Sequence, residues 1–138
     1  MIPIEAEAIL QGRFGHDCLI ALATICDGKP AVRTVNALYM DGAFYVVTHA
    51  LSGKMQQLAA DPHAAVCGEW FTGNAIGENI GHVCAPENQD IAICLREAFA
   101  AWYGNGHVDE SDPNTCILRL KLTDGVLMKN GKRFELHF

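Results

Sequence analysis

Hydrophobic residues dominate short stretches of this chain, and tight turns separate these stretches. Leu19 to Cys26 is an apolar run of strand type, and Asp27-Gly28 joins it to a second run from Ala31 to Met40. Asp41-Gly42 then leads into a third run from Ala43 to Thr48. Asp-Gly between such runs is a strong signal for a two-residue hairpin turn. The pattern therefore predicts a three-stranded antiparallel meander.

Helical spacing interrupts the strand pattern at three places. Ile4 to Gln11 has apolar residues at near-helical intervals, and Gly12 is a candidate stop signal. A second helix is expected from Ser52, whose hydroxyl is a candidate N-cap, to Ala60, because Asp61-Pro62 ends it. Pro86 to Tyr103 is amphipathic and predicts a third helix that packs through one apolar side.

The rest of the chain adds further strands. We expect strands or hairpins at Ala64 to Phe71, Ile80 to Cys84, Cys116 to Thr123, and Val126 to Phe138 with a turn at Asn130-Gly131. Thr72 to Asn79 is rich in glycine and asparagine, so the pattern assigns it no conformation. Six or seven strands with two or three helices predict a mainly β protein, a small antiparallel barrel that is closed or partly open. Residues 1–138 are expected to form one domain.

Composition narrows the range of partners. The net charge is -6 over 138 residues, which argues against nucleic acid or an anionic membrane as the partner. The beginning of the chain does not resemble a secretory signal, and no apolar run has membrane-spanning length, so we expect a cytoplasmic protein. The six cysteines are expected to be reduced, and without a CxxC pair we predict no metal site.

Candidate chemistry concentrates between the second strand and the second helix. Arg33, Thr48, Ser52 and Lys54 supply two cations, two hydroxyls and a helix N-terminus, which together suit a phosphate group. The chain has no GxGxxG motif after a strand, and Thr48 occupies the position of the first glycine of a Walker A loop. The phosphate site is therefore expected to be of another kind.

One family combines these features in the same order. An R-x-V sequence at Arg33 to Val35, a T-x-x-x-S-x-K sequence at Thr48 to Lys54, and a helix that ends in Asp-Pro resemble the pyridoxamine 5'-phosphate oxidase-like FMN-binding split barrels. The resemblance covers about Asp17 to Val83. It implies a split β-barrel that binds FMN at the interface of a homodimer.

The resemblance also implies roles for individual residues. Arg33 and Lys54 would hold the FMN phosphate, and Ser52 would add a hydroxyl. The other implied positions are Thr34, Val35 and Asn36 along the ribityl chain and ring edge, Val47 and Thr48 in place of a tyrosine-threonine pair, and Gly53 in place of a second basic residue.

Departures from the family pattern limit the functional prediction. Asn36, Ala37 and Leu38 stand where the pyridoxamine phosphate oxidases carry a basic residue for the substrate phosphate, and their carboxy-terminal signature is missing. The chain is therefore not expected to make pyridoxal phosphate. It is similar instead to small nitroimidazole-reductase or general-stress flavoproteins. The first hypothesis is an FMN-dependent oxidoreductase that passes electrons from NAD(P)H to a small organic acceptor.

Alternatives stay open. The second hypothesis is a flavin-binding or stress-sensing protein without catalysis, or one that binds deazaflavin or haem. His49 could approach the flavin, although a loop histidine is more often only solvated. Trp70 could stack on the flavin or fill a dimer core, and Asn74 could make contacts across a dimer. Trp102 is expected to serve packing alone.

Overall fold

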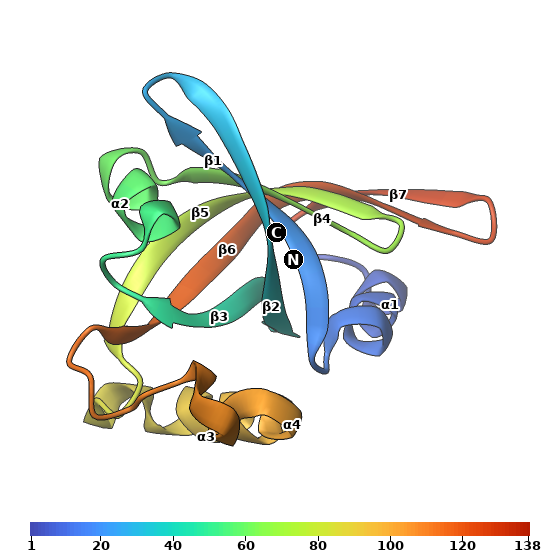
Figure 1. The fold of residues 1–138 in the computed structure, drawn as a ribbon. Helices are drawn as coiled ribbons and strands as arrows, with labels where there is room; N and C mark the ends of the chain where they lie inside the picture. The colour runs from blue at the N-terminus through green and yellow to red at the C-terminus, as the bar shows by residue number, and fades with distance from the viewer.

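The computed structural model describes all of residues 1–138, and seven antiparallel strands make up most of it (Figure 1). The strands are β1 (Cys18–Cys26), β2 (Lys29–Met40), β3 (Ala43–His49), β4 (His63–Gly68), β5 (Phe71–His82), β6 (Thr115–Lys129) and β7 (Lys132–His137). Their order is β3-β2-β1-β4-β5-β6-β7, and an additional pairing of β3 with β6 closes six of them into a barrel. The predicted fold class is confirmed.

Four α-helices flank the barrel, where two or three were predicted. They are α1 (Ile4–Phe14), α2 (Gly53–Ala60), α3 (Gln89–Ala98) and α4 (Ala100–Trp102). The single helix expected over residues 86–103 is divided, because Phe99 leaves helical geometry with φ -95° and ψ 15°. A 3-10 turn at Pro86–Asn88 precedes α3, and a π-helical turn at Tyr103–His107 follows α4. No helix is both long and apolar enough to cross a membrane.

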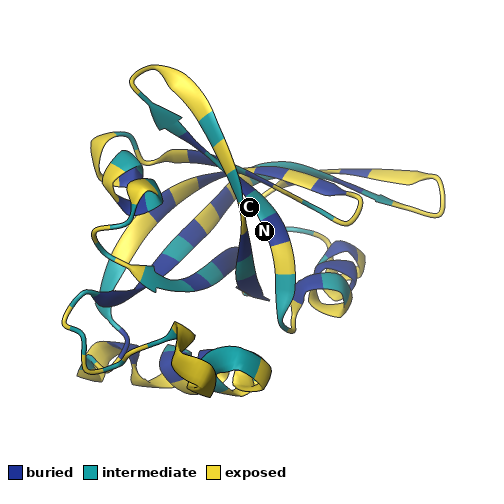
Figure 2. Cartoon of the chain, viewed as in Figure 1, coloured by how far each residue is buried: buried dark blue, intermediate teal, exposed yellow.

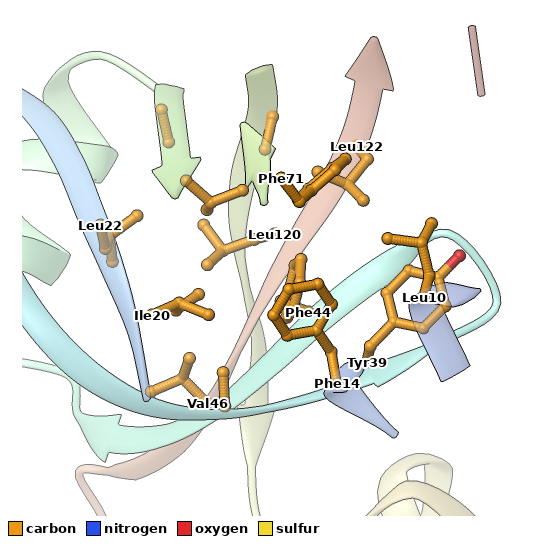
Figure 3. Close-up of a cluster of buried hydrophobic side chains, with 14 of the residues drawn as sticks. Leu10, Phe14, Ile20, Leu22, Tyr39, Phe44, Val46, Phe71, Leu120 and Leu122 are labelled. Atoms are coloured by element: carbon orange, nitrogen blue, oxygen red, sulfur yellow. The ribbon is translucent and has the colours of Figure 1, made fainter. Parts of the chain in front are cut away.

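The barrel is filled by side chains that alternate inward along its strands, as the burial pattern shows (Figure 2). Helix α1 contributes Leu10 and Phe14 to this core, and the Phe14 ring lies 5.5 Å from Phe44 and 6.0 Å from Phe71 (Figure 3). A second, smaller apolar cluster fixes α3 and α4 outside the barrel, where Leu95 and Phe99 are fully buried with residues of β2, β3 and β6.

Tight turns form where the sequence predicts them. Asp27-Gly28, Asp41-Gly42 and Asn130-Gly131 all have positive φ at both positions. The turn between β4 and β5 was missed, since the predicted strand from Ala64 to Phe71 runs through it. Trp70 adopts a φ of 51° there, a conformation that a bulky residue rarely takes. The sequence does not predict this turn, because no glycine stands at that position.

Several glycines lie inside helices and strands rather than at turns or helix ends. Helix α1 continues through Gly12 and ends at Phe14, with Gly15 as its C-cap. Gly73 and Gly77 lie at inward positions of β5, where a Cβ would come within 2.9 Å of the Phe71 ring and 2.8 Å of Leu58. These glycines therefore let the Phe71 ring and Leu58 of α2 pack closely on β5, in the segment for which the sequence pattern predicts no conformation.

The last strands are also longer than predicted. β6 is one strand of 15 residues where the pattern suggested two shorter runs. A Cβ on Gly125 would lie 2.8 Å from the Thr72 carbonyl oxygen of β5, so this glycine too permits close strand packing. β7 pairs with the end of β6 beyond the barrel, and Phe134 and Leu136 pack back onto the core.

Candidate functional site

The barrel opens between β2 and β3. β2 pairs with β1 from Lys29 to Ala37, but it pairs with β3 only through residues 38–40 and 43–45. Beyond that short ladder the two strands diverge, so β2 and β3 frame a gap that α2 and the segment after α3 border (Figure 1). Strand backbone with a free edge beside a helix N-terminus is well suited to receive a ligand.

A cavity of about 410 Å³ lies in this gap. It brings together five of the residues that the sequence singled out, namely Val35, Asn36, Val47, Thr48 and Lys54. The remaining lining residues are Val46, Trp102 and His107. The cavity is thus apolar along the strands, with polar groups and one cation at its ends.

Lys54 lines this cavity and lies close to Arg33, and neither cation has a carboxylate partner. Arg33 and Lys54 take part in none of the ion pairs of the structure. The pKa of the Lys54 ammonium is lowered, first because the group is half-buried and second because Arg33 is close. An anion bound between them would relieve both effects, since it restores an opposite charge to a partly desolvated site.

Ser52 does not cap α2 as predicted. It occupies the N-cap position, and its carbonyl oxygen accepts from the Gln56 amide at 3.0 Å, but its hydroxyl makes no capping hydrogen bond. The Ser52 Oγ is instead buried without any partner. A buried hydroxyl without a partner is costly, so this atom is a candidate contact for a ligand group. Gly53, exposed at the first helical position, leaves the adjoining amides uncovered.

Three predicted site residues, Arg33, Ser52 and Gly53, lie outside the cavity lining. Thr34 is the fourth predicted residue outside that lining. Its Cα pairs with that of Ala21, and its side chain is exposed on the outer face of the sheet. It shares that face with Leu19 and Val32, which are 63% and 70% exposed. The alternation of strand side chains places Thr34 there, because Val35 points into the barrel.

Asp17, which sequence reasoning does not identify, holds two residues that line the other end of the cavity. One oxygen of Asp17 accepts from the Asn36 amide at 2.9 Å, and the other accepts from the Trp102 indole N–H at 2.9 Å. Trp102 therefore lines the cavity in addition to packing on Phe99, at 4.8 Å between ring centroids. Trp102 packs as predicted, and its hydrogen bond to Asp17 adds a contact that the local sequence does not indicate, because the two residues lie 85 positions apart.

The other residues considered from sequence lie around the site or away from it. His49 receives a hydrogen bond from the Leu51 amide at Nδ1 and contacts Asp112 through Nε2 at 3.2 Å. It borders a second cavity of about 350 Å³ that shares Val47, Thr48 and His107 with the first. Trp70 is exposed at the β4–β5 turn, and Asn74 binds Asp124 on the outer face.

The site thus fits a phosphorylated ligand with a flat or extended body. Lys54 lines the cavity beside the start of α2, Arg33 lies close to Lys54, and Ser52 is the N-cap residue of the same helix. Groups of this kind suit a phosphate. The diverging strands and Trp102 supply apolar and aromatic walls for the rest.

Comparisons with known proteins identify the fold. No family model matches the chain, and no curated protein matches it in sequence. Among solved structures, general stress protein 26 from Bacillus anthracis superposes with a TM-score of 0.74 at 12% identity, covering 96% of this chain and 100% of that one.

Two further neighbours are described by the ligands that they bind. An FAD-binding protein from Mesorhizobium loti has a TM-score of 0.62 at 16% identity and covers 91% of this chain and 90% of its own. A haem-binding protein from Mycobacterium smegmatis has a TM-score of 0.71 at 17% identity, covering 99% of this chain and 59% of its own. The matching structures also include proteins described as pyridoxamine phosphate oxidase and NimC/NimA types, so the chain has the predicted split-barrel fold.

Proposed function

With this split-barrel fold as the premise, we propose that the protein binds FMN and acts as an oxidoreductase, using electrons from NAD(P)H to reduce a small organic acceptor. Arg33, Ser52 and Lys54 would hold the phosphate, and the cavity walls at Val35, Asn36, Val47 and Thr48 would hold the ribityl chain and ring. The observation that carries the proposal is the pair of neighbouring cations Arg33 and Lys54, which lack a carboxylate partner, together with the unpartnered buried hydroxyl of Ser52 at the N-cap of α2.

The chemistry divides between ligand and protein. A bound flavin supplies hydride and electron transfer, and the protein supplies position and electrostatics. Arg33 and Lys54 balance the phosphate monoester, which carries close to two negative charges at neutral pH. Asn36 and Trp102, both held by Asp17, fix the wall at the opposite end. His49 is already held by the Leu51 amide and Asp112, so we assign it no proton transfer.

We further propose that the FMN site is completed by a second copy of this chain. The outer face of β1, β4, β5 and β6 carries a shallow hollow of about 340 Å³ lined mainly by small side chains such as Ala21, Ala23 and Ala65. Leu19 on the same face pairs in register with Asn36, which lines the flavin cavity. An apolar face that reaches the cavity suits a partner subunit that covers the ligand.

The visible spectrum of the purified protein tests the cofactor. We expect flavin absorbance bands, or their appearance when FMN is added to the colourless protein. A Soret band in place of flavin bands would assign the cavity to haem and contradict the proposal. A folded protein that takes up no FMN would contradict it as well.

Anaerobic reduction tests the enzymatic part separately. NADH or NADPH is expected to bleach the bound flavin, and an organic acceptor is then expected to restore its absorbance. If neither nucleotide bleaches a flavin that dithionite does reduce, the protein binds flavin without this activity, and the non-catalytic hypothesis replaces the oxidoreductase.

A further inference from the structure

Arg33 is one of two arginines of this protein that contact no carboxylate; the other, Arg13, donates to the carbonyl oxygens of Glu69 and Met128. Arg96, Arg119 and Arg133 each contact a glutamate within 3.3 Å. Arg33 contacts neutral acceptors instead, with Nη1 donating to the carbonyl oxygens of Leu22 at 3.3 Å and Ala31 at 3.5 Å, and with the remaining contacts made to two side chains. The guanidinium is therefore oriented while its positive charge stays uncompensated.

The two side chains are Thr24 and Gln57, and with Arg33 they form a closed triangle. Arg33 Nη1 donates to Thr24 Oγ1 at 2.7 Å, and Arg33 Nη2 donates to Gln57 Oε1 at 2.8 Å. The Thr24 hydroxyl donates to the same Gln57 oxygen at 2.6 Å. Thr24 is 1% exposed, so its hydroxyl is satisfied entirely within this triangle.

Gln57 is the member of the triangle that joins it to the proposed phosphate site. It lies on α2, one turn after Lys54, and its amide nitrogen lies 3.8 Å from the position that a Cβ would take on Gly53. A glutamate at position 57 would accept the same two hydrogen bonds, but it would neutralise Arg33 and repel an anion at the start of the helix. A neutral side chain at this position keeps the cation available to a ligand.

We infer that Gln57 and Thr24 are positioning residues that give the site its selectivity for phosphorylated flavin over riboflavin. They act by aiming Arg33 without neutralising it, and this inference rests on the proposed binding of FMN. The ring and ribityl chain are common to both ligands, so the discrimination must come from groups at the phosphate end. The selectivity therefore depends on the charge state of the Arg33 environment as well as on Arg33 itself.

The test compares FMN and riboflavin binding to the full chain by fluorescence titration. The Gln57→Glu variant keeps the acceptor geometry and adds one negative charge, so FMN affinity is expected to fall by about tenfold or more. Riboflavin affinity is expected to stay within about twofold, since no charged ligand group is involved. The Thr24→Val variant, which removes the buried hydroxyl from the triangle, is expected to weaken FMN binding by about threefold to tenfold in the same selective way.

Gln56→Glu is the matched control. Gln56 is the exposed neighbour on α2 and donates to the Leu51 carbonyl oxygen, away from Arg33. The control adds the same charge to the same helix, and it is expected to change FMN affinity by less than about threefold at moderate salt.

Three results separate the outcomes. If Gln57→Glu binds FMN like the wild type, or loses FMN and riboflavin equally, the inference is overturned while the proposed function stands. If Gln56→Glu weakens FMN binding as much as Gln57→Glu does, a general charge effect replaces the triangle and the inference is also overturned. If the wild type binds neither flavin, the proposed function fails and the inference fails with it. Thermal melting of each ligand-free variant confirms that it is folded.

Discussion

At the scale of single residues, the site is defined by groups whose ordinary partners are missing. Ser52 has a buried hydroxyl without a hydrogen bond, and Arg33 and Lys54 have no carboxylate partner. Arg119, by contrast, is paired with Glu78 at 3.0 Å, whereas Arg13, like Arg33, donates only to neutral acceptors. The proposed ligand, bound near the start of α2, would supply partners for these groups.

Ser52 supports a prediction that distinguishes ligand binding from helix capping. A capping serine stabilises a protein by about 1 kcal/mol over alanine. Because the Ser52 hydroxyl makes no capping bond, we expect Ser52→Ala to leave the free energy of unfolding of the ligand-free protein within about 0.5 kcal/mol of the wild type. FMN affinity is expected to fall by about threefold to tenfold. Urea denaturation and FMN titration measure the two quantities, and a destabilised variant with unchanged affinity would assign Ser52 to the helix.

At the scale of elements, the helical segment after β5 closes the cavity that β2 and β3 open. Glu110 ties this segment together, since it accepts from Arg96 of α3 at 2.8 Å and from the Tyr103 hydroxyl at 2.5 Å. Trp102, which directly precedes Tyr103 in the chain, donates a hydrogen bond to Asp17, the residue just before β1. The position of the cavity wall therefore depends on side chains that bridge separate elements.

The Glu110 contacts predict a dependence of stability on acid. Arg96 first, and then the hydroxyl of Tyr103, lower the pKa of Glu110 from 4.5 to about 2. A carboxyl group whose pKa is lower in the folded state stabilises the fold fully above its unfolded pKa, and this contribution is lost as the pH falls toward the folded value. At pH 7 the free energy of unfolding of the wild type is thus expected to exceed that of Glu110→Gln by on the order of 1–2 kcal/mol. The difference is this small because the Arg96–Glu110 pair is partly exposed.

Urea denaturation at pH 7, 4 and 2.5 measures this difference. It is expected to shrink steadily between pH 4.5 and 2, where the wild-type carboxyl becomes protonated. A difference that stays constant over this range would show that Glu110 acts through shape and neutral hydrogen bonds alone.

The placement of Trp102 gives a prediction by fluorescence. FMN bound in the cavity is expected to quench Trp102 strongly, because the indole lines that cavity, whereas Trp70 is 71% exposed at the β4–β5 turn. Quenching by FMN should therefore persist in Trp70→Phe and largely disappear in Trp102→Phe. The reverse pattern would place the flavin near the β4–β5 turn.

Local sequence signals predict the first half of the fold well and the closing elements poorly. The Asp-Gly turns predict the meander, and five of the predicted site residues line one cavity, whereas Arg33 and Ser52 lie outside its lining. Asp17, Gln57 and Trp102 were not identified as parts of the site, because their roles depend on contacts between distant segments. Gly73 and Gly77 are residues typical of turns, but in β5 they make room for the Phe71 ring and for Leu58.

At the scale of the whole molecule, the proposed FMN site includes a second subunit beside the cavity. Val32 is 70% exposed on the outer face, next in register to Ala23. A charge at the centre of an apolar interface is strongly unfavourable, so Val32→Asp is expected to shift the protein from dimer to monomer and to weaken FMN binding. Analytical ultracentrifugation measures the mass.

Ile93→Asp is the matched control, since Ile93 is 51% exposed on α3 and away from this face. It is expected to leave both the mass and the FMN affinity unchanged. A wild-type monomer that binds FMN with full affinity would contradict the requirement for a second subunit.

The most direct test of the central claim is an FMN titration of the Arg33→Ala/Lys54→Ala variant. Each residue is expected to contribute about 1.5–3 kcal/mol as a charge-assisted contact to the phosphate, so affinity should fall by about a hundredfold or more. Lys29→Ala/Lys129→Ala removes the same charge from exposed positions that form no ion pair and is expected to bind FMN within about threefold of the wild type. Equal affinities of the two double variants would contradict a phosphate site at Arg33 and Lys54.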